Sequence, residues 1–335
     1  MPVFLRQQAR VGAYLLRNKL RGRERYPLIV ELEPLFACNL ACAGCGKTAY
    51  PPDVLRQRMS VATAVAAIEE SGAPMVAIAG GEPLLHAEIH RLSAELLRRK
   101  RFVYLCTNGL LLEEKLSLFK PSPYFSWVVH LDGLRARHDE LVGREGVFER
   151  AVEGIRAAKK AGFQVTTNST FFASDSPVMV RDVLDFLNDE LKVDAMMISP
   201  GYGYEAAADQ EHFLAGSQTR RLFAEAFAGD RRKRWRLNHS PLFLDFLEGK
   251  IELECTPWGI PCYSVLGWQR PCYLRAEGYC ATFRELVETT DWSPYGRSGG
   301  DPQCRDCMAH CGYEPSAVLA TMRSLRQGLR AMTGN

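Results

Sequence analysis

The stretch FACNLACAGCGK, residues 36–47, holds three cysteines, Cys38, Cys42 and Cys45, in the spacing Cys-x3-Cys-x2-Cys. Soft thiolates on one short loop are the ligands that iron–sulfur clusters prefer. A cubane [4Fe–4S] cluster takes four ligands, so a loop with three leaves one iron open to a small molecule. A structural zinc loop whose fourth ligand lies elsewhere in the chain is the alternative.

Around this loop, short apolar segments alternate with segments of helical pattern. Strands buried on both faces read in this way, as continuous apolar runs rather than as strict alternation. Ser60 is a typical N-cap for the helix that follows it, and Gly72 is a typical residue just past a helix end. The pattern predicts an α/β fold, a partial (β/α)6 barrel over residues 28–215. The predicted strands are residues 28–34, 75–81, 102–109, 125–133, 163–172 and 194–202.

Polar residues gather where these predicted strands end. Ligands of parallel sheets bind at the carboxyl ends of the strands, so these residues are the candidates for binding. Two adjacent glycines also let a backbone approach a ligand closely. Each polar side chain can instead satisfy a backbone group at its strand end. The candidates are Gly80, Gly81, Glu82, Asn108, His130, Asn168 and Ser199.

A second group of cysteines follows in residues 216–335, where the alternation of strands and helices stops. Cys255 and Cys272 are spaced Cys-x11-Gly-x4-Cys, and Cys304, Cys307 and Cys311 follow as Cys-x2-Cys-x3-Cys. We expect a single auxiliary site, either an iron–sulfur cluster or zinc, with Cys311 competing for a place among the four ligands. Free thiols are the alternative. Cys262 and Cys280 fit no such spacing and are expected to be ordinary thiols.

The N-terminal segment, residues 1–27, is strongly basic. Residues 2–26 hold seven Lys or Arg and one acidic residue, Glu24. At helical spacing Val11 and Leu15 share one face, and Arg10 and Arg17 lie opposite. Such a helix either lies on an anionic membrane surface or closes one end of the barrel with its charges in water.

Composition narrows the class of protein. The 335 residues, with 47% hydrophobic and 24% charged, are ordinary for a globular chain, and a net charge of +3 does not argue for nucleic acid. No apolar run of 18 residues and no signal-like start appear in the sequence. We therefore expect a cytoplasmic location, with peripheral contact at the inner membrane face as an addition, and cysteines that serve as ligands or free thiols.

The cysteine loop after an apolar strand, followed one βα unit later by Gly80-Gly81-Glu82, resembles the radical S-adenosylmethionine (SAM) superfamily. That resemblance implies a [4Fe–4S] cluster on Cys38, Cys42 and Cys45, SAM on the open iron, and an electron donor such as flavodoxin or ferredoxin. The C-terminal cysteines resemble a shortened SPASM or twitch domain, which carries auxiliary clusters. Many members have an aromatic residue before the third cysteine, near the adenine, where this chain has Gly44.

Longer stretches resemble the radical SAM family of hopanoid biosynthesis, the adenosylhopane synthases. They run nearly end to end and include ELEPLFACNLACAGCGK, AGGEPLLH, YLCTNGLLL, NHSPLFLDFL, ECTPWG, GWQRPCYL and CGYEP. The resemblance implies a transferase that adds the 5′-deoxyadenosyl radical to the alkene of diploptene, a hydrophobic triterpene. A radical SAM enzyme that abstracts hydrogen from a peptide or carbohydrate is the alternative, and a non-catalytic metal protein is a further one.

Addition to an alkene leaves a carbon radical, which requires a hydrogen-atom donor. Cys106 is the candidate, because a residue two before Asn108 in a strand points to the same face. A small buried cysteine in the core is the alternative. Several aromatic residues are expected to line an apolar pocket for the hydrocarbon: Tyr202, Tyr204, Phe213, Trp258 and Trp268.

Overall fold

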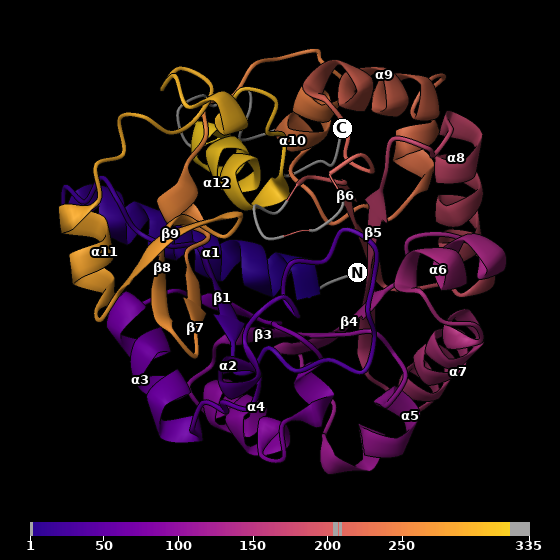
Figure 1. Cartoon of the computed structure of the whole chain (residues 1–335), viewed down its shortest axis with the longest axis horizontal. Helices are drawn as coiled ribbons and strands as arrows, with labels where there is room; N and C mark the ends of the chain where they lie inside the picture. The colour runs from indigo at the N-terminus through magenta and orange to yellow at the C-terminus, as the bar shows by residue number, and fades with distance from the viewer. Residues whose placement is uncertain (1–2, 204–206, 208–209, 322–335) are drawn as a thin grey trace.

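Six parallel strands form the centre of the fold, in the order β6-β5-β4-β3-β2-β1. The computed structural model describes residues 3–203, 207 and 210–321, and Figure 1 shows the strands in a ring with helices outside. Each of the six predicted strands is present within two to three residues of its expected ends. They are β1 (Ile29–Glu33), β2 (Met75–Ile78), β3 (Phe102–Thr107), β4 (Phe125–His130), β5 (Gln164–Phe171) and β6 (Ala195–Pro200).

Helices between the strands cover the outside of this sheet. The hydroxyl of Ser60 accepts a hydrogen bond from the Thr63 backbone N–H at 3.1 Å, and Gly72 ends the same helix at φ 70°. Both capping predictions are therefore confirmed. The outer helices are α3 (Val61–Ser71), α4 (Ile89–Arg98), α5 (Leu112–Lys115), α6 (Arg135–Val142), α7 (Val147–Lys160) and α8 (Pro177–Asp185), with the short α2 (Pro52–Leu55) after the cysteine loop.

The C-terminal region extends the same sheet beyond β1. β7 pairs with β1 in parallel, and β8 and β9 follow as antiparallel neighbours. The sequence pattern does not show this extension, because β7 is three residues long and its partner precedes it by more than 220 residues. The remaining elements are β7 (Cys262–Ser264), β8 (Gly267–Cys272), β9 (Arg275–Cys280), α9 (Gly216–Ala226), α10 (Pro241–Leu247), α11 (Phe283–Thr289) and α12 (His310–Thr321).

The N-terminal helix α1 (Val3–Leu20) lies across the middle of the ring of strands (Figure 1). Tyr104 of β3 donates a hydrogen bond from its hydroxyl to Gln7 Oε1 at 3.0 Å, and Leu15 is buried. The expectation that this segment closes the barrel is therefore confirmed, while membrane contact stays a prediction. None of the helices in the described part of the chain is long and apolar enough to span a membrane.

Candidate active site

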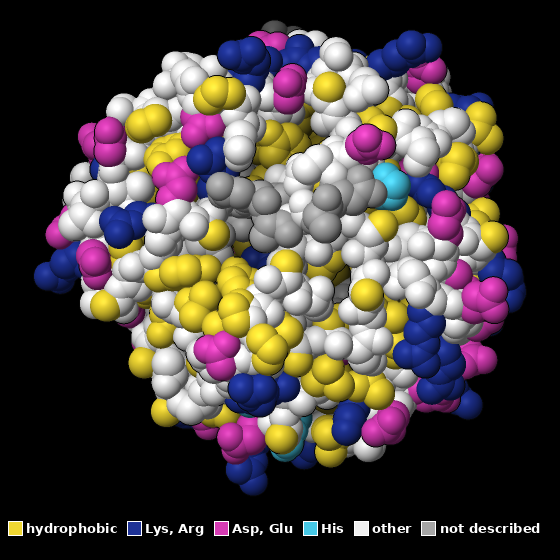
Figure 2. Space-filling view, in the orientation of Figure 1, with side chains coloured by type: hydrophobic (Ala, Val, Ile, Leu, Met, Phe, Trp, Pro, Cys, Tyr) yellow, Lys and Arg dark blue, Asp and Glu magenta, His cyan; other side chains and the backbone are white. Residues whose placement is uncertain are grey.

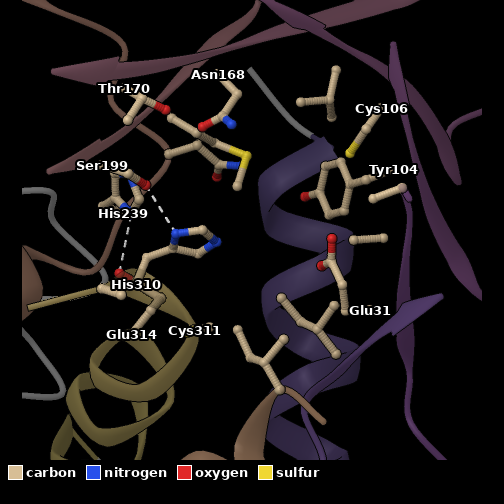
Figure 3. Close-up of a pocket in the computed structure, with 18 of the residues that line it drawn as sticks. Glu31, Tyr104, Cys106, Asn168, Thr170, Ser199, His239, His310, Cys311 and Glu314 are labelled. Carbon is tan, nitrogen blue, oxygen red and sulfur yellow. Dashed lines mark hydrogen bonds and ion pairs between the residues drawn. The ribbon is translucent and has the colours of Figure 1, made fainter. Parts of the chain in front are cut away.

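The strands enclose a cavity of about 1360 Å³ that runs from the cysteine loop to α1. Figure 3 shows Glu31, Tyr104 and Cys106 on one wall and Asn168, Ser199 and His310 on the opposite wall. In the view of Figure 2, hydrophobic side chains gather to the lower left of the centre, and charged side chains lie mostly towards the periphery. A cavity of this size exceeds the usual volume of small-molecule sites, about 300–1,000 Å³, and has room for two molecules.

The cysteine loop leaves β1 and is held to the C-terminal region by buried contacts. Lys47 forms an ion pair with Glu33 at 3.0 Å, and both side chains are buried. Lys47 Nζ also lies 4.2 Å from the centre of the Tyr273 ring, and Phe36 stacks on Tyr50. An ion pair that is shielded from water and bonded at both ends fixes the loop strongly, because separating it would leave a buried charge unpaired.

Gly80 and Gly81 pack directly against the backbone of this loop. A Cβ on Gly80 would lie 2.3 Å from the carbonyl oxygen of Leu35, and one on Gly81 would lie 2.0 Å from that of Ala37. The backbone N–H of Gly81 donates to Leu35 at 3.1 Å. The two glycines therefore allow the strand end and the loop to touch. Both also line the cavity, so their predicted contact with a ligand stays open.

Glu82 is hydrogen-bonded within the protein, and its predicted contact with an ammonium group stays a prediction. Its carboxylate, which is buried, accepts hydrogen bonds from the backbone N–H groups of Leu84 and Asn108 at 3.0 and 2.8 Å and from the Thr107 hydroxyl at 2.9 Å. Burial raises the pKa of Glu82 to about 7, although these bonds lower it. The side chain ties the end of β2 to the end of β3 and is not among the residues that line the cavity.

The three loop thiols all line the cavity, as a cluster that binds a small molecule requires. Asn108 holds the loop from β3 by donating from Nδ2 to Asn39 Oδ1 at 2.8 Å. Within the described residues, no three His, Cys, Asp or Glu side chains converge closely enough to hold a single metal ion. Three thiols that line one cavity fit a cluster with an open iron, and zinc with a fourth ligand elsewhere stays the alternative.

His130 and Asp132 form a buried pair at the end of β4. His130 Nε2 lies 2.5 Å from Asp132 Oδ2, and the Asp132 Oδ1 accepts from the Thr170 backbone at 2.6 Å. Burial lowers the pKa of His130, but Asp132 more than offsets this and the pKa is raised. His130 therefore holds its proton more readily than a free imidazole does, and its ring lines the cavity, where it can meet an anionic group such as a carboxylate.

Cys106 lines the cavity from β3, on the same face as Tyr104. Burial raises the pKa of the Cys106 thiol well above its ordinary value, and the carboxyls of Glu31 and Glu82 raise it further. Cys106 is therefore a protonated thiol inside the cavity, with its S–H bond available. Glu31 is itself affected, because burial and then Glu33 raise the pKa of its carboxyl to about 8.

On the opposite wall, α12 contributes polar groups that face β6. His310 Nδ1 lies 2.9 Å from the hydroxyl of Ser199, and burial, with a smaller effect of His239, lowers the pKa of His310 to about 4. The ring is therefore neutral near pH 7. Asn168 lines the cavity nearby, and its buried Oδ1 has no partner among the described residues. A buried acceptor without a hydrogen-bond partner destabilises the folded protein, so Asn168 Oδ1 is suited to accept a hydrogen bond from a ligand, for example from a ribose hydroxyl.

His239 clamps α12 to the strands. The backbone N–H of Ile198 donates to His239 Nε2 at 2.9 Å, so Nδ1 carries the proton and donates to Glu314 Oε2 at 3.1 Å. Glu314 also accepts from the Ser240 backbone at 2.6 Å. These bonds fix the start of α12, and with it His310, against the cavity.

An aromatic ring lies beside the loop although position 44 is a glycine. A Cβ on Gly44 would lie 3.0 Å from the ring of Phe213 and 3.8 Å from that of Phe172. Phe213 and Tyr202 line the cavity as predicted. Two of the other aromatic residues do not line the cavity: Trp268 packs in the core against Tyr263 and Phe283, and Trp258 packs against Trp292. Tyr204 lies outside the described residues.

The five C-terminal cysteines of the predicted auxiliary site surround one small cavity of about 30 Å³, here called the cysteine chamber: Cys255, Cys272, Cys304, Cys307 and Cys311. A Cβ on Gly312 would lie 2.3 Å from Cys255 Sγ, so the glycine lets α12 approach this thiol. Cys262 and Cys280 do not line the chamber. The structure therefore brings the predicted set together, with Cys311 as a fifth candidate beside the other four.

Several residues of the site were not found from the sequence. Glu31 could have been found, because a carboxylate inside an otherwise apolar strand points to a special environment. His310 and Glu314 lie in the C-terminal segment and carry no local signal. Their role arises from where α12 meets β6, which the sequence does not reveal.

Two sequence models together cover most of the chain. Residues 32–187 match the radical SAM superfamily, and residues 196–331 match a domain of unknown function, DUF3463. Residues 32–187, which carry the cysteine loop and most of the barrel, therefore belong to the radical SAM superfamily. Members of this superfamily use a [4Fe–4S] cluster and SAM, and solved structures of the same fold hold SAM.

Curated relatives match the barrel region. The chain is 27% identical over 160 residues to the Fe-coproporphyrin III synthase of Methanosarcina barkeri, a match that covers 46% of this chain and 39% of that protein. It is 26% identical over 191 residues to the AdoMet-dependent heme synthase of Oleidesulfovibrio alaskensis, covering 55% of this chain and 47% of that protein. The chain thus spans less than half the length of these relatives.

Solved structures extend the likeness to nearly the whole chain. SuiB of Streptococcus suis, bound to its precursor peptide SuiA, has a TM-score of 0.62 and 16% identity over 92% of this chain and 76% of that chain. The structure of anSMEcpe with bound AdoMet has a TM-score of 0.58 and 17% identity over 89% of this chain and 98% of that chain. At these identities the likeness shows the fold.

Proposed function

We propose that this radical SAM protein joins the 5′-deoxyadenosyl group of SAM to the terminal alkene of diploptene. The single observation that carries the proposal is Cys106, a protonated thiol on the wall of a large cavity that also holds the cysteine loop. The sequence stretches shared with the adenosylhopane synthases support the choice of substrate. None of the relatives described above is named for this activity.

The cluster, when bound to Cys38, Cys42 and Cys45, would supply the electron that cleaves SAM into methionine and the 5′-deoxyadenosyl radical. Asn108 and the Lys47–Glu33 ion pair hold the loop in place. His130, whose pKa is raised by Asp132, and the unpaired Asn168 Oδ1 are suited to the carboxylate and hydroxyl groups of SAM. The protein's part is to bind, orient and exclude water.

The overall reaction balances when one electron, in addition to the one that cleaves SAM, and one proton are supplied. The new bond forms between C5′ and the terminal CH2 of the alkene, and the unpaired electron moves to the neighbouring tertiary carbon. Cys106 gives that carbon the hydrogen atom of its weak S–H bond. The sulfur radical that remains returns to a thiol by taking a proton and one electron from the reductant that also serves the cluster, a flavodoxin or ferredoxin by class.

The test is an anaerobic reaction with SAM, a reductant and diploptene, followed by mass spectrometry. Formation of an adenosylated triterpene supports addition, whereas free 5′-deoxyadenosine as the sole nucleoside product would favour hydrogen abstraction from a peptide or carbohydrate. In D2O the exchangeable thiol should deliver one deuterium to the tertiary carbon.

Cys106→Ala sharpens the assignment of the donor. SAM cleavage and bond formation should continue, but the carbon radical should be quenched from either face or should rearrange, giving mixed products. Cys280→Ala is the matched control, because Cys280 is a buried strand cysteine that lies outside the cavity. If Cys106→Ala makes the same single product at the parent rate, the donor lies elsewhere.

The cysteine chamber supports a second metal site, which we also propose. Four of its five thiols would bind an iron–sulfur cluster or zinc. A volume of about 30 Å³ between largely apolar walls leaves no room for a substrate. The metal would therefore stabilise the fold or carry an electron, and it would not bind the reacting molecules.

A further inference from the structure

The helix α1 is a thin wall between the cavity and solvent. Gln7, Val11 and Leu15 line the cavity from its inner face. Of its described side chains at residues 6–20, only those of Leu15 and Asn18 are fully buried. An element that buries so little apolar surface opens at low free-energy cost compared with the strands.

The cavity reaches the surface along one side of α1. The exposed residues Gln8 and Ala9 of α1 line it, and so do the exposed Lys233 and Arg236. Gly12 also lines the cavity, and an added Cβ there would meet nothing within 4 Å. A glycine inside a helix costs about 1 kcal/mol of stability relative to alanine. Here its missing side chain leaves the opening free.

The outer face of α1 is itself apolar. Ala9, Ala13, Leu16 and Leu20 recur at helical spacing on the side opposite Leu15, and all four are exposed. Leu16 is 52% exposed and Leu20 79% exposed. This stripe, called the outer stripe below, is flanked by basic residues on the helix and just beyond it: Arg6, Arg10, Arg17, Lys19, Arg21, Arg23 and Arg25.

We infer that the outer stripe docks on an anionic lipid bilayer and that the apolar substrate passes from the bilayer into the cavity beside Gly12. This inference rests on the proposed function for the identity of the substrate, whereas docking itself does not. Exposed leucines flanked by Lys and Arg are the surface of a helix that lies in the membrane interface.

The positive charge of the N-terminal segment favours an anionic bilayer over other partners for the outer stripe. Residues 2–26 hold seven basic residues against one acidic residue, Glu24. Arg10, Arg17 and Lys19 form no ion pair with the described residues, so their charges are available to lipid headgroups. The acidic residues near the opening, Asp194 and Asp230, are paired with Lys159 and Lys233. Each basic residue near an anionic leaflet contributes about 1 kcal/mol, and salt screens this attraction.

Docking is tested by co-sedimentation with phosphatidylcholine vesicles, with and without phosphatidylglycerol. We expect the double variant L16E/L20E to lower partition onto the anionic vesicles at least tenfold, and high salt to lower it for the parent. The control L118E/V178E changes two side chains elsewhere of similar exposure, 51% and 53%, and should bind as the parent does. Equal binding of the two double variants would overturn the inference.

Entry is tested separately. With diploptene supplied in vesicles, L16E/L20E should turn over at least tenfold more slowly than the parent, and with diploptene in detergent micelles it should match the parent. Gly12→Leu should bind vesicles normally but retain less diploptene from them, measured by mass spectrometry of the re-isolated protein without SAM. Unimpaired retention by Gly12→Leu would overturn the entry route. If no adduct forms under any condition, the proposed function fails, and the vesicle-binding result still decides docking.

Discussion

The cysteine loop and the cysteine chamber use the same kind of ligand in opposite settings. The loop draws three thiols from eight consecutive residues, 38–45, and presents them to a cavity of about 1360 Å³. The chamber draws five thiols from separated segments between residues 255 and 311 and encloses about 30 Å³. A site that reacts must leave a coordination position open, whereas a site that only stabilises or holds an electron can be closed.

We expect the largest difference between the two sites when the thiols of the loop are removed and those of the chamber are kept. The variant C38A/C42A/C45A should lose reductive SAM cleavage altogether, because no open iron remains, yet it should retain the metal of the chamber. Cleavage is measured as methionine and 5′-deoxyadenosine released, and metal by iron, sulfide and zinc analysis after anaerobic reconstitution. Retained cleavage would contradict the assignment of the loop.

Removing the chamber from that variant is the next largest change. Adding C272A and C307A should remove the remaining metal and lower the melting temperature by about 5 °C or more. In a chain of this size a loss of 1 kcal/mol in the free energy of unfolding lowers the melting temperature by about 2–4 °C or less, so this shift corresponds to a loss of more than about 1 kcal/mol. Adding C262A and C280A instead, both outside the chamber, should leave the metal in place. Single Ala variants of Cys255 and Cys311 then show which of them is the fourth ligand.

The contrast also explains what the sequence could predict. The six strands and the loop follow from local apolar runs and from cysteine spacing, and Cys106 follows from its alternation with Asn108. The C-terminal contributions depend on contacts across the chain. The contacts of His310 with Ser199 and of β7 with β1 each join segments more than 100 residues apart. No periodicity records such contacts, so they appear only in the fold.

The cavity wall carries a buried carboxyl, that of Glu31, whose protonation makes the stability of the fold depend on pH. Burial raises the pKa of Glu31 to about 8, against an ordinary value of 4.5. A carboxyl with a raised folded pKa contributes stability that is full below its unfolded pKa and is lost as the pH rises through 8. Glu31→Gln should therefore match the parent near pH 5 and exceed it at pH 9, by about 2–4 kcal/mol.

This pH dependence is measured by denaturant unfolding of the reconstituted protein from pH 5 to 9. Glu145→Gln, at an exposed carboxylate, is the matched control and should follow the parent at each pH. A constant difference between Glu31→Gln and the parent would show that Glu31 is not desolvated as the structure indicates.

The smallest expected effect concerns Gly44, the one position where the loop departs from the common superfamily pattern. The ring of Phe213 approaches this position to 3.0 Å from a Cβ that the glycine lacks, and it also lines the cavity. We expect Phe213 to provide the aromatic surface near the adenine that other members take from the loop itself. Stacking of an aromatic ring contributes about 0.5–1.5 kcal/mol beyond its buried area, so Phe213→Ala should raise the KM for SAM about two- to tenfold and change kcat little. Phe213→Tyr should restore the parent value, because a ring is enough.

Phe227→Ala, at a buried ring outside the cavity, controls for general loss of packing: it should lower the melting temperature without changing the KM for SAM. If Phe213→Ala lowers stability alone and leaves KM unchanged, Phe213 only supports the loop, and the chain uses no aromatic contact at this position.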